Sequence, residues 1–214
     1  MVTKQDVAKG LLGIKAVFLR PDEPFTWASG IKSPIYCDNR LVLSYPEVRD
    51  TVEAGLAELI SERFPQADTI MGTATAGIAH AALVAERLGK PMGYVRGSAK
   101  DHGRKNQIEG RLETGMRVVV VEDLISTGGS SIECAEVLRA AGAEVLAVVS
   151  IFTYGMAKAR ANFEAAGFAH ESLCDFDTLV EVAAQEGYVR PQDVARLRAF
   201  RDNPSDESWI GRTA

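Results

Sequence analysis

The feature that most constrains the fold of this 214-residue chain is a run of four valines, Val118 to Val121. A strand with one face in water alternates apolar and polar residues, so an unbroken apolar run predicts a strand covered on both faces. Short runs at residues 69–71, 92–95 and 145–151 have the length of further strands. Helical patterns separate these runs. Strands that alternate with helices predict an α/β fold, a central parallel sheet flanked by helices.

Proline and glycine mark the ends of the predicted helices. Pro46 suits the first turn of a helix that precedes the first core strand. Two later helices are expected at residues 78–88 and 131–141, because Gly89 and Gly142 stand where each helical pattern stops.

The two terminal regions do not follow this alternation. Apolar residues at steps of four, three and four predict one helix face near the start: Val7, Leu11, Ile14 and Phe18. The patterns after residue 157 are helical as well. We therefore expect a single domain with a sheet core and an appendage over one end of it: residues 1–214 in all, the core at about 66–155, the appendage at about 1–45 and 156–214.

A long polar segment interrupts the core between two predicted strands. Residues 96–111 read Arg-Gly-Ser-Ala-Lys-Asp-His-Gly-Arg-Lys-Asn-Gln-Ile-Glu-Gly-Arg and have almost nothing to bury. Loops of this length inside compact domains are usually functional or disordered. The position between core strands favours a lid over about residues 97–110.

Charge and composition exclude several classes of function. The net charge of −5 argues against a nucleic-acid-binding protein. Charged residues interrupt residues 1–10, unlike a signal peptide, and no stretch approaches the roughly 18 apolar residues of a membrane span. Three separated cysteines, Cys37, Cys134 and Cys174, lack metal-ligand spacing and predict reduced thiols in a cytoplasmic protein.

Two carboxylates and a glycine-containing loop follow the valine run. Glu122 and Asp123 stand at the expected carboxyl end of the strand, where open α/β sheets bind ligands. Residues 126–130, Ser-Thr-Gly-Gly-Ser, precede a predicted helix whose start favours an anion. Gly128 and Gly129 let backbone N–H groups converge on a phosphate. The acids would repel that phosphate, so we assign them to ribose hydroxyls, or to magnesium through water.

Three segments resemble a known family. Residues 118–130 resemble the phosphoribosyl pyrophosphate signature of type I phosphoribosyltransferases. Residues 25–36, Phe-Thr-Trp-Ala-Ser-Gly-Ile-Lys-Ser-Pro-Ile-Tyr, are similar to the base-binding segment of orotate phosphoribosyltransferases. Residues 96–103, Arg-Gly-Ser-Ala-Lys-Asp-His-Gly, resemble the catalytic lid of the same family.

This resemblance implies a fold and a reaction. The fold is that of type I phosphoribosyltransferases, with a five-stranded parallel core and a small hood formed by the N- and C-terminal segments. The reaction transfers the 5-phosphoribosyl group of phosphoribosyl pyrophosphate to orotate, which gives orotidine 5′-monophosphate and pyrophosphate in pyrimidine biosynthesis. The cofactor is Mg²⁺, bound mainly through the substrate with no direct protein ligand. The assembly is a homodimer whose lids act in the neighbouring site.

The resemblance also implies roles for particular residues. The expected catalytic residues are Lys100, His102 and Asp123. The residues expected to bind phosphoribosyl pyrophosphate are Arg96, Lys100, His102, Glu122, Asp123, Leu124, Ile125, Ser126, Thr127, Gly128, Gly129 and Ser130. The residues expected to bind orotate are Ser126, Ser29 and Gly30. The loop at residues 72–77 is expected to face the pyrophosphate.

Four positions depart from the family pattern. Many members have a lysine where this chain has Ala28, another at Ala76, an arginine at Tyr154 and a lid lysine at Gly97. Fewer cations are therefore expected near orotate and pyrophosphate.

Two alternative functions stay open at this point. One is a phosphoribosyltransferase for another base, against which the segment at residues 25–36 argues. The other is a non-catalytic regulator that senses phosphoribosyl pyrophosphate and binds nucleic acid. Such a regulator would be expected to carry a basic surface or an added DNA-binding module. Trp27 could stack on a base or belong to the core.

Overall fold

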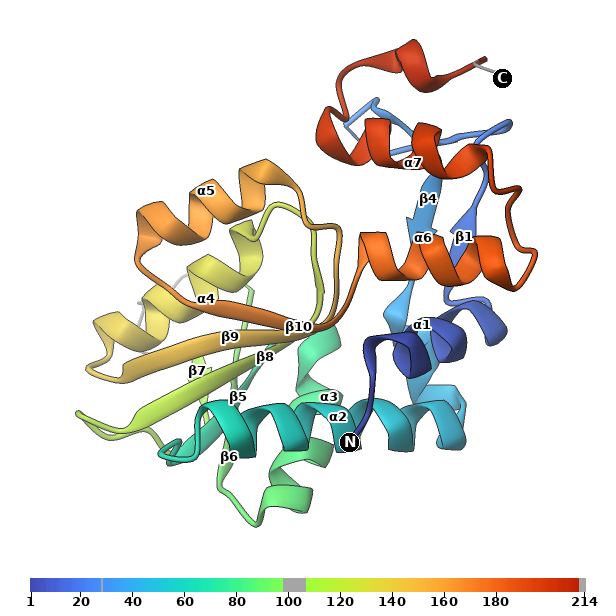
Figure 1. Cartoon of the computed structure of the whole chain (residues 1–214). Helices are drawn as coiled ribbons and strands as arrows, with labels where there is room; N and C mark the ends of the chain where they lie inside the picture. Colours follow the sequence, from blue (N-terminus) through green and yellow to red (C-terminus); the bar gives the residue numbers. More distant parts are fainter. Residues whose placement is uncertain (28, 98–106, 212–214) are drawn as a thin grey trace.

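The computed structural model describes residues 1–27, 29–97 and 107–211. Six strands form its central sheet: β5 (Thr69–Thr73), β6 (Met92–Val95), β7 (Ile108–Glu109), β8 (Arg117–Ile125), β9 (Glu144–Thr153) and β10 (His170–Asp175). Their order across the sheet is β10-β9-β8-β5-β6-β7 (Figure 1). Neighbouring strands are parallel except for β6 and β7, which are antiparallel. No helix in these described ranges is both long and apolar enough to cross a membrane.

The predicted coverage of the valine run on both faces is confirmed. Residues 118–121 lie in β8, the strand between β5 and β9, and each is fully buried. Val119 and Val121 belong to one core cluster, and Val118 and Val120 belong to the other. Burying one valine contributes about 1.5–3 kcal/mol relative to leaving it exposed. A position inside the sheet, where all four valines are buried, is therefore the stable place for β8. Figure 1 shows the helices that cover the two faces: α2 (Pro46–Arg63) and α3 (Ala76–Leu88) on one side, α4 (Gly129–Ala140) and α5 (Ala157–Ala166) on the other.

The helix ends follow the proline and glycine signals, whereas two helix starts do not follow the prediction. Helix α2 begins at Pro46, and α3 ends at Gly89, whose φ of 59° is left-handed. Helices α3 and α4 begin at Ala76 and Gly129, earlier than the predicted starts at residues 78 and 131. Both start within short loops in which glycine obscures the helical pattern.

The chain after β9 extends the sheet past the expected core boundary near residue 155. Helix α5 leads into β10, which pairs in parallel with β9 from His170↔Val148 to Asp175↔Thr153. Because β10 is an edge strand with partly exposed side chains, its sequence is polar and lacked an apolar signal. Strands β10, β9, β8, β5 and β6 form the five-stranded parallel core that the resemblance implied, and β7 adds a sixth, antiparallel strand at the edge.

Segments from both ends of the chain lie together beside the sheet (Figure 1). They comprise α1 (Lys4–Gly13), α6 (Phe176–Gln185), α7 (Asp193–Asp202), the 3-10 helices η1 (Asn39–Ser44) and η3 (Glu207–Trp209), and the short strands β1 (Val17–Leu19), β2 (Phe25–Thr26), β3 (Lys32–Ser33) and β4 (Ile35–Cys37). Strand β1 pairs with β4, and β2 pairs with β3, both antiparallel. The predicted face of the first helix was wrong at Phe18, which lies in β1 after α1 has ended.

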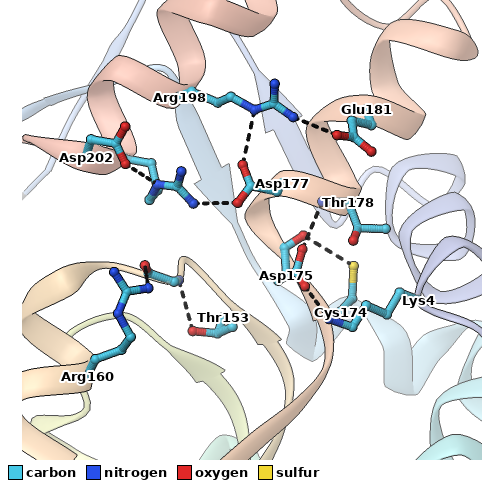
Figure 2. A network of polar contacts seen from close by, with 12 residues as sticks. Lys4, Thr153, Arg160, Cys174, Asp175, Asp177, Thr178, Glu181, Arg198 and Asp202 are labelled. Carbon is cyan, nitrogen blue, oxygen red and sulfur yellow. Dashed lines mark hydrogen bonds and ion pairs between the residues drawn. The ribbon is translucent and has the colours of Figure 1, made fainter.

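Ion pairs fasten α6 to its neighbours (Figure 2). Asp175 caps α6 by accepting from the Thr178 N–H at 2.9 Å, and it also accepts from Lys4 Nζ at 2.5 Å. In the first turn of α6, Asp177 accepts from Arg198 and Arg201 of α7. These contacts connect the end of the sheet to both terminal segments.

A buried guanidinium joins the N-terminal segment to the C-terminal one. The Arg196 side chain on α7 is 6% exposed, and that of Asp193 is 4% exposed. Arg196 donates to Asp193 Oδ1 at 2.9 Å, to Asp22 Oδ1 at 2.7 Å, and to the carbonyl oxygens of Pro21 and Trp209. Its planar N–H groups therefore satisfy acceptors from three separate stretches of chain.

Replacing Arg196 should destabilise the protein far more than replacing its exposed neighbour. Arg196→Met leaves the carbonyl oxygens of Pro21 and Trp209 without this donor, and Asp193 keeps only its bonds from Arg190. Each buried acceptor left unsatisfied costs about 1–3 kcal/mol. Arg198→Met removes ion pairs that are exposed, for which about 0.2–1 kcal/mol is usual. Urea unfolding of both variants measures the difference. Equal losses would show that the buried network contributes no more than a surface pair.

Candidate active site

Two adjacent carboxylates lie on opposite faces of β8 near its carboxyl end. Glu122 points toward α4, where its Oε2 accepts from Ser131 Oγ at 3.2 Å, and it is 6% exposed. Its Oε1 accepts from the Asp123 N–H at 3.0 Å. Asp123 is half-buried, on the face that Val119 and Val121 share. The strand thus presents one enclosed acid and one accessible acid.

Burial changes the acidity of Glu122. Removal of its carboxyl group from water, followed by the negative charge of Asp123, raises the pKa of Glu122 to about 7. The two carboxyl groups therefore differ in environment, although the sequence places them side by side.

The loop after β8 is shaped for an anion. Gly128 has a φ of 80° and forms the N-cap of α4, so the positive end of the helix faces the loop. A Cβ atom at Gly128 would lie 2.6 Å from Cε2 of Phe163, which leaves room for glycine alone. Asn162 Nδ2 donates to the Thr127 carbonyl at 2.8 Å and fixes the other side of the loop. Ser126 and Thr127 are half-buried, whereas Ser130 is exposed on the first turn of α4.

A second loop approaches β8 from the side of β5. A Cβ atom at Gly77 would lie 2.3 Å from the Val121 carbonyl oxygen, so glycine permits this close packing. Thr73 Oγ1 donates to that same carbonyl oxygen at 3.2 Å. The expected pyrophosphate loop is thereby held against the strand that bears the acids.

Arg96 shares a small cavity with the glycine-containing loop. The cavity has a volume of about 110 Å³, and its lining includes Thr73, Arg96 and Ser130. The Arg96 N–H donates to the Gln107 carbonyl at 2.9 Å, so the two residues that flank the segment 97–106 are joined. Lys100 and His102, the expected lid residues, lie outside the described part of the chain.

The expected base-binding residues Ser29 and Gly30 occupy an exposed turn between β2 and β3. The turn is closed by the Gly30 N–H, which donates to the Trp27 carbonyl at 2.8 Å. Gly30 has a φ of 85°, which suits glycine. Lys32 Nζ donates to Thr26 Oγ1 at 2.8 Å across the two strands.

Trp27 and Tyr154 belong to an aromatic cluster. The Trp27 ring lies 5.7 Å from the rings of both Tyr154 and Phe200, measured between centroids. Tyr154 is 4% exposed, and burial raises the pKa of its hydroxyl above the ordinary range. This favours the core role for Trp27. It also shows that Tyr154 packs the hood where many family members place an arginine.

Sequence reasoning missed two asparagines that hold the site. Asn162 contacts the glycine-containing loop, and Asn39 donates through Nδ2 to the Asp123 carbonyl at 2.7 Å. Neither residue stands in a motif. Asn39 lies just after residues 25–36, the segment that resembles a family base-binding segment. That position is the only sequence feature that could have pointed to Asn39.

Known proteins resemble this chain in sequence and in fold. The family model described as "Phosphoribosyl transferase domain" matches residues 44–166. An orotate phosphoribosyltransferase of Bacillus anthracis (strain CDC 684 / NRRL 3495) is 59% identical over 207 residues, which cover 97% of this chain and 99% of that one.

Two solved structures extend the likeness to three dimensions. The crystal structure of orotate phosphoribosyltransferase from Aeropyrum pernix is 32% identical with a TM-score of 0.74, covering 86% of this chain and 99% of that one. The structure of Leishmania donovani UMP synthase is 30% identical with a TM-score of 0.79; the match covers 92% of this chain and 42% of the synthase. The predicted fold class is confirmed.

The raised pKa of Glu122 should appear in the pH dependence of stability. The unfolded chain ionises Glu122 near 4.5 and the folded chain near 7, so the folded state loses stability as the pH rises between these values. Glu122→Gln cannot ionise. The free energy of unfolding of Glu122→Gln, minus that of the parent, should therefore increase by on the order of 2–3 kcal/mol between pH 4.5 and pH 7.

Chemical denaturation at pH 4.5 and pH 8, without ligands, measures this gain. Glu133→Gln is the matched control, because Glu133 is an exposed glutamate on α4. A difference between Glu122→Gln and the parent that is independent of pH would contradict the assignment.

Proposed function

Since this chain belongs to the orotate phosphoribosyltransferase family, we propose that its acid pair and glycine-containing loop bind phosphoribosyl pyrophosphate for transfer to orotate. A bond forms between a ring nitrogen of orotate and C1′ of the ribose, the bond from C1′ to pyrophosphate breaks, and orotidine 5′-monophosphate leaves. The observation that supports this best is that Asp123 and the N-terminus of α4 follow one another at the carboxyl end of β8, while the cavity of Arg96 reaches Ser130 on the first turn of α4.

The residues of the loop take the ribose 5-phosphate end of the substrate. Backbone N–H groups from Thr127 to Ser130 and the start of α4 provide donors and partial positive charge. Asp123 accepts from the ribose hydroxyls, and Glu122 supports the same strand end from its enclosed position. Leu124 and Ile125 continue β8 between the acids and the loop.

Positive charge from this chain stabilises the leaving group. Departure of pyrophosphate leaves a cation-like sugar, as in glycoside hydrolysis. Negative charge develops on the pyrophosphate, so positive groups beside it stabilise the transition state. Arg96 serves this role from the end of β6, and Lys100 and His102 serve it from the lid. Orotate is an anion whose ring nitrogen is acidic, so no strong general base and no covalent intermediate are assigned.

Orotate lies on the side of the hood. The carboxylate of the base needs donors, and the turn at Ser29 and Gly30, together with Ser126, provides neutral ones. With Ala28 and Tyr154 at positions where many family members are cationic, these neutral donors carry more of the recognition. We assign residues 1–45 and 176–214 to the hood, since α5 and β10 belong to the sheet and its covering layer, and the segment between β6 and β7 to the lid.

Magnesium is the proposed cofactor. Within residues 1–27, 29–97 and 107–211, no group of three or more His, Cys, Asp and Glu side chains could hold an ion by itself. In this proposal the metal arrives on the phosphate oxygens and keeps several waters, with Asp123 as the accessible acid nearby. When bound, Mg²⁺ supplies positive charge that stabilises the pyrophosphate leaving group.

The proposed setting is a cytoplasmic homodimer in which each lid reaches the neighbouring site. All three cysteines are free thiols, in keeping with a reducing compartment. A nucleic-acid-binding regulator is not favoured, since the relatives are named as transferases and the net charge is −5. The same relatives, named orotate phosphoribosyltransferases, disfavour a transferase for another base.

The purified protein should consume orotate when phosphoribosyl pyrophosphate and magnesium are present. Loss of orotate absorbance measures the rate, and chelation of the metal should abolish it. Uracil should react with a kcat/KM lower by roughly 100-fold or more, because donors arranged for the carboxylate are left unpaired. Comparable efficiency with uracil, adenine or xanthine would overturn the choice of base.

Two inactive variants should restore activity when mixed. Lys100→Ala damages the lid, and Asp123→Asn damages the ribose site. If lids act across the dimer, one site of each mixed dimer has both parts intact, so full exchange recovers about a quarter of the parental activity. The matched control mixes each variant with itself. Exchange without recovery would place the lid in its own subunit's site.

A further inference from the structure

Strand β8 is paired for longer on its β9 side than on its β5 side, and the pairing with β5 stops before the acid pair. On the β9 side, pairing continues to Ile125↔Thr153. On the β5 side, it stops at Gly72↔Val121. The backbone of Asp123 thus lies beyond the β5 ladder, and a buried carbonyl group there needs another donor.

Asn39 supplies that donor. Its side chain is fully buried at the start of η1, and Nδ2 donates to the Asp123 carbonyl oxygen at 2.7 Å. The other end of the amide is also engaged, because Cys37 Sγ donates to Oδ1 at 3.2 Å. This contact fixes which way the amide faces, since Oδ1 is an acceptor and Nδ2 a donor.

The surroundings of Asn39 keep the thiol protonated. Burial, followed by the negative charges of Asp123 and Asp38, holds the pKa of Cys37 well above its usual value. Arg40, the remaining charged neighbour on this segment, forms a bidentate pair with Asp38. Cys37 belongs to β4, which pairs with β1, so the donor set is anchored in the hood.

We propose that Asn39 is a positioning residue for Asp123, holding the unpaired end of β8 so that the carboxylate meets the ribose hydroxyls. The inference rests on the proposed function, because it gives Asp123 its role in binding phosphoribosyl pyrophosphate. Asn39 does not touch substrate. It acts through the backbone of the residue that does.

Asn39→Asp tests this with a readout that a merely structural role would not change. The introduced carboxylate, when ionised, cannot donate to the carbonyl oxygen and adds a negative charge beside Asp123. At neutral pH and above, kcat/KM for phosphoribosyl pyrophosphate should fall about tenfold, the effect expected when a buried acceptor loses its donor. When protonated, the introduced carboxyl group can donate an O–H and still accept from Cys37. The ratio of variant to parent kcat/KM should therefore rise as the pH falls from 8 to 6.

Asn39→Ser is the companion variant, because its short neutral side chain cannot span the gap and does not titrate. It should show a similar loss with a ratio to parent that is constant across pH. Asn203→Asp, an exposed position that follows α7, makes the same chemical change and should match the parent throughout. Thermal unfolding checks that each variant is folded.

The outcomes separate this inference from the proposed function. A parent protein that consumes no orotate refutes the proposed function. An active parent with folded Asn39 variants of parental kcat/KM refutes the positioning role. Equal losses in Asn39→Asp and Asn39→Ser with no recovery at low pH would reduce Asn39 to packing, and failure of both to fold would assign it to stability; either result overturns the proposal.

Discussion

The burial of the four β8 valines on both faces of the sheet is the constraint on which the rest of this structure depends. These valines are covered on one face by α2 and α3 and on the other by α4 and α5, so the strand has one register and one orientation. Because side chains alternate, the same register sends Glu122 toward α4 and Asp123 toward the opposite face. A slip of one residue would exchange the two acids and expose the wrong valines to each core. Core packing and the geometry of the site are therefore one requirement.

The site is completed by segments that lie far from β8 in the sequence. Asn39 reaches the Asp123 backbone across 84 residues of sequence, and Asn162 reaches Thr127 across 35. Each amide replaces a ladder or helix partner that the loop region lacks. Rigid elements thus hold both ends of the segment from Asp123 to Thr127, which leaves the Gly128 turn free to present its N–H groups. Preorganisation of this kind is how a charged ligand is bound without rearranging the loop.

Local patterns predicted the core strands, most helix ends and the glycine-containing turn after β8, because these depend on residues close together in the sequence. The valine run required two covered faces, and Gly89 ended α3 as expected. Strand β10 was not predicted, because an edge strand needs no apolar run. Phe18 was assigned to a helix because β1 follows α1 after a short turn. The roles of Asn39 and Phe163 could not be predicted, since a buried amide and a ring beneath Gly128 gain their meaning only from tertiary contacts.

The union of the two chain ends through Arg196 has a consequence for synthesis on the ribosome. Asp22 is synthesised 174 residues before Arg196, the residue that donates to it. Trp27 is likewise synthesised long before Phe200, against which its ring packs. The strands from β5 to β9 can pair while translation continues, since their partners are near neighbours in the chain. The hood, by contrast, assembles only after the last helix has left the exit tunnel. A product that ends before α7 would therefore lack the Arg196 contacts that join Pro21 and Asp22 to the end of the chain, even with the partners of its sheet strands already present.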